Sequence, residues 1–176
     1  MEQVTFNTEV SISDIIVLLS FISIIVGGIF ALYKWNINQK LKRAEYIKTL
    51  FDEIRSNSEI VFYLFDYGSD WYNEKFHGSK LEGSIDYTLS YFSYICYLKK
   101  KKVITKSEFN YFKYELERIL TNKQFQNYIY NVYHFSNKIN QPIPFVNLFQ
   151  YAKDKGYFDH DFWDKNSKKY PHLLNF

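Results

Sequence analysis

A chain of 176 residues has room for one compact domain, and its charges are unevenly distributed. From Lys34 to the end, 22 Lys and Arg face 16 Asp and Glu. This excess is compatible with a position near an anionic leaflet but too diffuse to indicate a nucleic-acid partner, and none is expected. The single cysteine, Cys96, excludes an intrachain disulfide.

An apolar segment without any charged residue runs from Ile15 to Tyr33. As a helix it would span about 28 Å, close to the ~30 Å of a bilayer core. A buried core helix normally carries a polar stripe, which this segment lacks. In a cleaved signal peptide, the apolar region normally follows a basic region. Residues 1–14 are acidic instead. We therefore expect an uncleaved transmembrane helix at 15–33, after a short extracytoplasmic N-terminus at 1–14.

Basic residues lie only on the C-terminal side of this segment. Lys34, Lys40, Lys42 and Arg43 follow it, and no Lys or Arg precedes it. The positive-inside rule then predicts a single-pass protein of the inner (plasma) membrane, with its N-terminus outside and its C-terminal domain in the cytoplasm.

Small residues recur along one face of the expected span, at Ser23, Gly27 and Ala31. Spacing of four residues lets two membrane helices approach closely, so these three form a candidate helix-association face for a homo-oligomer. The alternative is that small residues are simply common in membrane spans.

Residues 34–56 carry apolar side chains at helical spacing and predict a juxtamembrane amphipathic helix, with nothing to break it from the anchor. A break at 57–59 and an apolar turn or two at 60–65 should follow. Helices are then expected from three capping boxes, which begin at Ser79, Thr105 and Thr121, to about Leu98, Leu120 and Phe135.

Pro142 and Pro144 mark a loop, and Phe145 to Asp154 predicts a last helix, ended by Gly156. The sequence thus predicts an all-α protein, with an N-terminal transmembrane helix and a cytoplasmic bundle of about five helices at 57–156. The aromatic tail at 157–176 is expected to pack irregularly or as a short helix.

No catalytic, cofactor or metal site is expected from the motifs. The four histidines lack zinc-ligand spacing. The densest group of metal-capable side chains is Asp159, His160, Asp161 and Asp164, and a solvated acidic tail is the favoured interpretation of it.

A loop rich in aromatic and polar residues holds the candidate loop site, which consists of Asp66, Asp70, Trp71 and His77. Trp and His beside glycines in a loop are retained when they pack or bind something, and packing across the bundle is favoured. Glu82 and Asp86, one helical turn apart, would add carboxylates for acid/base chemistry if they are buried together.

Three segments carry a resemblance: Asp66 to Tyr72, Tyr91 to Leu98, and the Ile-Thr-x-x-Glu-Phe pattern that opens Ile104 to Leu120. With the anchor, they make the chain similar to a group of uncharacterised bacterial single-pass membrane proteins with a small helical cytoplasmic domain. The similarity covers most of Lys34 to Gly156. It implies the architecture and no activity.

Three functions remain open at this point. The first is a membrane-tethered interaction or sensor module that binds a protein or small ligand. The second is a membrane-perturbing effector, of the kind found in bacterial defence or stress systems, that assembles through its transmembrane helix. The third is a membrane-bound hydrolase that uses Asp66, Asp70, His77, Glu82 or Asp86.

Overall fold

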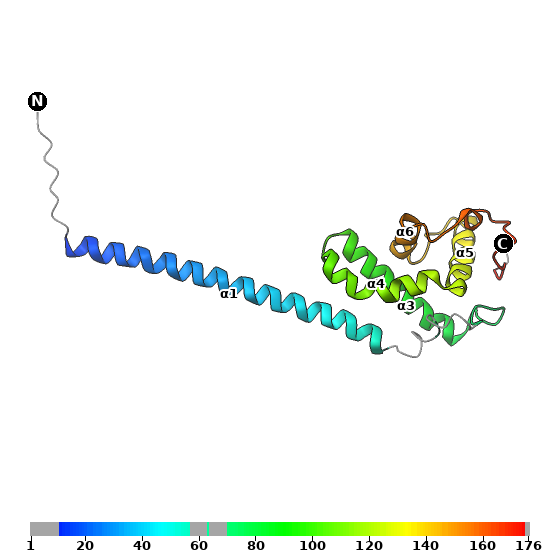
Figure 1. Cartoon of the computed structure of the whole chain (residues 1–176), viewed down its shortest axis with the longest axis horizontal. Coiled ribbons are helices and arrows are strands. Elements are labelled where there is room, and N and C mark those ends of the chain that lie inside the picture. Colours follow the sequence, from blue (N-terminus) through cyan, green and yellow to red (C-terminus); the bar gives the residue numbers. More distant parts are fainter. Residues whose placement is uncertain (1–10, 57–62, 64–69, 175–176) are drawn as a thin grey trace, which may run out of the picture. The chain divides into compact units, whose positions relative to one another are not determined.

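The computed structural model describes residues 11–56, 63 and 70–174 (Figure 1). Within these residues the protein is all-α, as expected. The elements are α1 (Ile12–Ser56), α3 (Lys80–Lys100), α4 (Lys106–Thr121), α5 (Lys123–Lys138), α6 (Val146–Asp154) and the 3-10 helix η1 (His160–Trp163). The expected break at 57–59, most of the apolar turns at 60–65, and Asp66 lie outside the described residues.

Helix α1 runs without interruption for 45 residues, so the anchor and the juxtamembrane segment are one helix. It begins after Ser11, whose backbone N–H donates to the Asp14 carboxylate at 3.0 Å. Its most apolar stretch has a mean hydropathy of 2.9 and none of it is buried against protein. By length and composition the helix can cross a membrane, and an N-terminal signal sequence has the same properties.

The chain divides into two compact units, Met1–Lys48 and Thr49–Phe176. The second unit includes the last turns of α1, where Leu50 and Ile54 are buried. The Tyr91 hydroxyl of α3 donates to the Leu50 carbonyl, and the Phe51 and Phe112 rings lie 6.2 Å apart. These turns therefore belong to the core of the helical domain.

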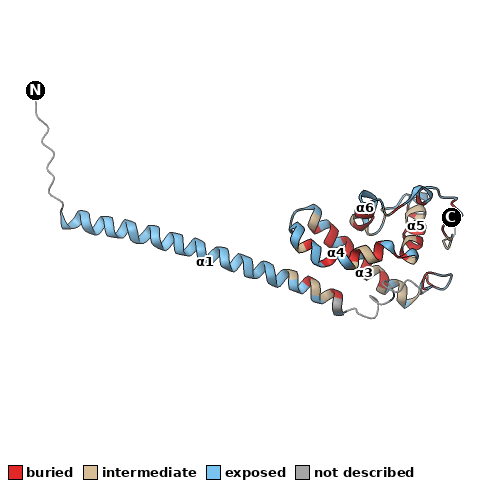
Figure 2. Cartoon of the chain, viewed as in Figure 1, coloured by how far each residue is buried: buried red, intermediate tan, exposed pale blue. Residues whose placement is uncertain are grey.

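Helix α3 is the centre of that domain, and it packs against both α4 and α6. Figure 2 shows the buried faces of α3, α4 and α5, which contrast with the exposed length of α1. The side chains that are completely buried are mainly large and apolar, and they include Ile85, Leu89, Phe92, Phe112, Leu116, Ile119 and Phe125. Burial of each such side chain stabilises the fold by roughly 1.5–3 kcal/mol.

The three expected capping boxes have different outcomes. The Thr105 box is confirmed, because the Thr105 hydroxyl accepts from the Glu108 N–H at 3.2 Å and the Glu108 carboxylate accepts from the Thr105 N–H at 2.6 Å. The Ser79 box is half formed. Its hydroxyl accepts from the Glu82 N–H at 3.1 Å, but the Glu82 carboxylate binds the N–H of Gly78.

The third expected capping box, at Thr121, is wrong by one residue, because the helix begins one residue later. Thr121 ends α4, and its hydroxyl donates back to the Glu117 carbonyl at 2.9 Å. The N-cap of α5 is Asn122, whose side-chain oxygen accepts from the N–H groups of Gln124 at 2.8 Å and Phe125 at 3.3 Å. Asn is a stronger N-cap than Thr, so the shift follows from local chemistry.

The segment 157–174 packs as part of the domain. Asp159 caps η1 by accepting from the Phe162 N–H at 3.1 Å, and Phe162 is completely buried. The Tyr170 ring stacks on Tyr130 of α5, with centroids 4.5 Å apart and planes 10° apart. The expected tail is thus a 3-10 turn followed by an ordered segment that covers α5.

Candidate functional site

The aromatic loop that precedes α3 packs around Tyr128 of α5. Trp71 and Phe76 are only 4% and 2% exposed. The rings of Trp71, Tyr72 and Phe76 have their centroids 6.4, 5.4 and 5.2 Å from that of Tyr128. Trp71 of the candidate loop site is therefore a core residue, although its indole N–H has no hydrogen-bond partner in the described structure.

A polar network borders this aromatic cluster. The His77 Nδ1 lies 2.8 Å from one Glu82 oxygen, and the Gly78 N–H donates to the other oxygen at 2.6 Å. The Tyr128 hydroxyl donates to Asp86 at 2.6 Å, one turn further along α3. The structure thus brings His77, Glu82 and Asp86 together. It places Asp70 elsewhere, where it accepts from the Gln124 amide at 2.8 Å.

Burial sets the electrostatics of this network. It raises the pKa of Asp86, and the Glu82 charge adds to the effect while the Tyr128 hydrogen bond opposes it. Burial also raises the pKa of both Tyr72 and Tyr128, so their hydroxyls remain protonated donors at neutral pH.

The contacts of this network cap α3 and hold the preceding loop in place. Both oxygens of Glu82 are occupied, one by His77 and one by the Gly78 N–H. The other ring nitrogen of His77, Nε2, lies 3.4 Å from the Tyr72 hydroxyl, and the raised pKa of this hydroxyl makes it a weak nucleophile. These contacts hold the aromatic loop against the first turn of α3.

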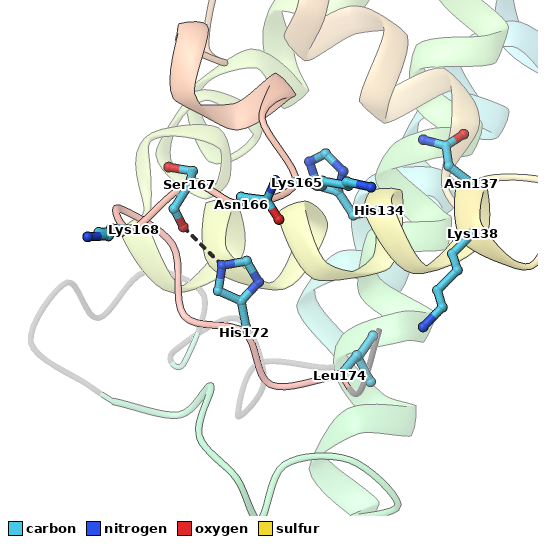
Figure 3. A pocket seen from close by; sticks show the side chains of 9 residues that line it. All are labelled: His134, Asn137, Lys138, Lys165, Asn166, Ser167, Lys168, His172 and Leu174. Carbon is cyan, nitrogen blue, oxygen red and sulfur yellow. Dashed lines mark hydrogen bonds between the residues drawn. The ribbon is translucent and has the colours of Figure 1, made fainter.

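A second place with the character of a site is a pocket of about 1000 Å³ between α5 and the C-terminal segment. Figure 3 shows its lining side chains, which project from α5 and from the loop after η1. They are predominantly basic or polar: His134, Asn137, Lys138, Lys165, Asn166, Ser167, Lys168, His172 and Leu174. We call this the basic pocket.

Buried hydrogen bonds hold the walls of the basic pocket together. Asn131 of α5 is completely buried; its amide donates to the Pro171 carbonyl at 2.6 Å and its oxygen accepts from the Leu173 N–H at 3.0 Å. The Tyr130 hydroxyl donates to the Asp164 carbonyl at 2.8 Å. The loop that carries Lys165 to Lys168 is therefore fastened to α5 at both ends.

The two histidines of the pocket are oriented in the same way. The His134 Nε2–H donates to the Phe162 carbonyl, and the His172 Nε2–H donates to the Ser167 carbonyl, each at 2.9 Å. Such bonds fix which ring nitrogen carries the proton. Three lysines and two histidines thus surround the pocket, and none of the described residues that line it is acidic.

No protein-family model, curated protein or solved structure matches the chain. Function must then be inferred from the site itself. Within the described residues, no three His, Cys, Asp or Glu side chains lie together as a metal site would require. The Asp159 carboxylate, from the acidic group in the tail, is bound by Lys169 and Tyr170.

The basic pocket was not anticipated from the sequence. His134 and Lys138 lie on one helix, and their partners follow a loop, a helix and a 3-10 turn. The available signal was the run Lys165-Asn166-Ser167-Lys168, which is dense in polar and basic residues. Nothing in that run indicates that it folds back onto α5.

Proposed function

We propose that this protein is a membrane-tethered interaction or sensor module. In this proposal α1 anchors it in the inner membrane, and the helical domain binds its ligand or protein partner in the cytoplasm. The observation that carries the proposal is the exposure of α1. Its large apolar side chains from Ile12 to Leu41 remain exposed, whereas a water-soluble helix buries one face.

The charges along α1 support the orientation. Asp14 is the acidic residue of its first turn, and Lys34, Lys40, Lys42 and Arg43 follow the apolar stretch. Basic residues close to one end of a span favour retention of that end in the cytoplasm. The same residues would also be attracted to anionic lipid headgroups, by about 1 kcal/mol for each Lys or Arg near the surface.

Cysteine labelling tests this proposal, because the native thiol is inert. Cys96 is buried, and burial raises the pKa of its thiol to about 12. We expect a membrane-impermeant maleimide to label Ser13→Cys in intact spheroplasts. It should label Lys168→Cys only after lysis, and the protein should resist alkaline carbonate extraction.

Two results contradict the proposal. Extraction of the full chain into the carbonate supernatant would exclude the anchor. Labelling of Lys168→Cys, but not of Ser13→Cys, in intact spheroplasts would invert the orientation. The unsubstituted chain is the control, and it should remain unlabelled in both conditions.

The other two functions have less support. A membrane-bound hydrolase would use His77, Glu82 and Asp86, but these side chains are engaged in holding the loop to α3 and the aromatic core. A membrane-perturbing effector depends on association of anchors through Ser23, Gly27 and Ala31.

A further inference from the structure

We propose that the basic pocket binds a small molecule that bears phosphate groups. This inference rests on the proposed function and deepens it, because it names the chemical class of the ligand. The volume of the pocket, about 1000 Å³, lies at the upper end of the range for small-molecule sites. The pocket therefore has room for more than an inorganic ion.

Charge is the first argument for this ligand class. Lys138, Lys165 and Lys168 all line the pocket, and no acidic side chain is found among the described residues of its lining. Two carboxylates of the neighbouring segment have partners of their own: Asp164 accepts from the Asn166 N–H at 2.9 Å, and Asp159 binds Lys169. An anion that enters the pocket would therefore meet a net positive charge on the described side chains that line it.

The kind of donor is the second argument. The cationic side chains among the described residues of the pocket are the three lysines, Lys138, Lys165 and Lys168. Lysine is a common phosphate ligand, and its ammonium group acts as a compact point charge that several phosphate oxygens can share. Asn137 and Asn166 add neutral side-chain amides at the rim.

Preorganisation is the third argument. Asn131 and Tyr130 fasten the loop to α5, and the Ser167 N–H donates to the Asp164 carbonyl at 3.1 Å. The positive charges of the loop are thus held near those of α5 before any ligand arrives. A ligand gains affinity when the site does not have to be ordered on binding.

The test measures binding of inorganic pyrophosphate to the full-length chain in a neutral detergent. The method is isothermal titration calorimetry. We expect saturable binding to the unsubstituted chain. The pocket variant, Lys138→Gln with Lys165→Gln and Lys168→Gln, should bind about tenfold more weakly or worse, because it loses three charge-assisted contacts.

A matched control removes the same charge elsewhere. Lys75, Lys80 and Lys123 are exposed and lie outside the pocket lining. Their triple substitution by Gln should leave the affinity within about twofold, since exposed distant charges are screened at ordinary salt. All six lysines are exposed, so both variants should keep the circular dichroism spectrum of the parent.

Three outcomes overturn the inference: no saturable binding of pyrophosphate, equal weakening in the two triple variants, or displacement of pyrophosphate by citrate at equal concentration. The last result would show a general anion site and not a phosphate site. None of them affects the carbonate and labelling experiments, so failure of this inference and failure of the anchor are distinguishable.

The phosphate can belong to a soluble metabolite or to a lipid headgroup, and a second arm separates these sources. Binding is repeated in nanodiscs of phosphatidylcholine, with and without phosphatidylglycerol. Anionic lipid repels pyrophosphate from the parent and from the pocket variant alike. The ratio of their affinities for pyrophosphate is therefore independent of this general repulsion. A smaller ratio with phosphatidylglycerol identifies a headgroup that already occupies the pocket, and an unchanged ratio identifies a soluble ligand.

Discussion

At the scale of single residues, Asp86 shows how packing decides the chemistry of a side chain. Its carboxyl group is flanked by Tyr128, Glu82 and His77, and burial raises its pKa. A carboxyl group whose pKa is higher in the folded than in the unfolded chain stabilises the fold while it is protonated. That contribution is complete below the ordinary pKa and is lost as the pH rises through the raised value.

The variant Asp86→Asn tests this dependence. Asn keeps an acceptor for the Tyr128 hydroxyl but cannot ionise, so the stability of the variant relative to the parent should increase as the pH rises from about 4 towards neutrality. The measurement is the free energy of urea unfolding at a series of pH values. Glu82 and His77 are present in both proteins and contribute to both curves.

Glu74→Gln is the control, because Glu74 is exposed in the loop before α3. Its stability difference from the parent should stay constant across the same pH range. A stability of Asp86→Asn that falls relative to the parent as the pH rises would show that the charged hydrogen bond to Tyr128 outweighs burial.

At the scale of elements, α1 presents small residues in a way that makes its self-association testable. A Cβ atom at Gly27 would meet nothing within 4 Å, so a larger side chain there is tolerated by the isolated helix. The Ser23 hydroxyl donates to the Leu19 carbonyl at 2.8 Å and is satisfied within the helix. A change caused by substitution at Gly27 would therefore come from contact between chains.

We propose that α1 forms a homo-oligomer through Ser23, Gly27 and Ala31, and we expect Gly27→Leu to weaken it. The large side chain would keep two helix backbones apart at the point of closest approach. Chemical crosslinking and analytical ultracentrifugation of the full chain in detergent measure the effect. Identical behaviour of the parent and Gly27→Leu would remove the proposal.

Gly28 offers a matched control. A Cβ there also meets nothing within 4 Å, but the residue is rotated by about 100° from Gly27 around the helix. Gly28→Leu adds the same volume and hydrophobicity to a different face. We therefore expect it to leave the oligomer unchanged.

At the scale of the whole molecule, the C-terminal segment completes the core of the domain. Phe162 is completely buried, stacks on Phe158 with centroids 4.0 Å apart, and also contacts the rings of Tyr130 and Tyr170. These contacts join η1, α5 and the segment after η1. Loss of the Phe162 ring would therefore affect the domain and the basic pocket together.

We expect Phe162→Ala to lower the free energy of unfolding by about 3–5 kcal/mol, because it leaves a cavity in the core. Trp163→Ala removes a larger side chain that is 37% exposed, and should cost about 1–2 kcal/mol. Urea unfolding of the full chain in neutral detergent, followed by circular dichroism, measures both. A loss for Phe162→Ala as small as the ~1–2 kcal/mol expected of Trp163→Ala would show that Phe162 is not part of the cooperative core.

Features that depend on neighbouring residues could be predicted from the sequence. The all-α class, the long apolar helix, the Thr105 capping box and the end of α6 at Gly156 follow from periodicity, side-chain caps and backbone freedom within a few positions. The box at Thr121 was misplaced by one residue because two adjacent polar residues competed for the same cap.

Contacts between distant segments could not be predicted in the same way. The pairing of Asn131 with Pro171 and Leu173, and the basic pocket that this pairing supports, require the chain to return across α6 and η1 onto α5. Such a return depends on which apolar surfaces fit one another when they are buried. The local sequence pattern does not predict that fit, because each surface is apolar whichever partner covers it.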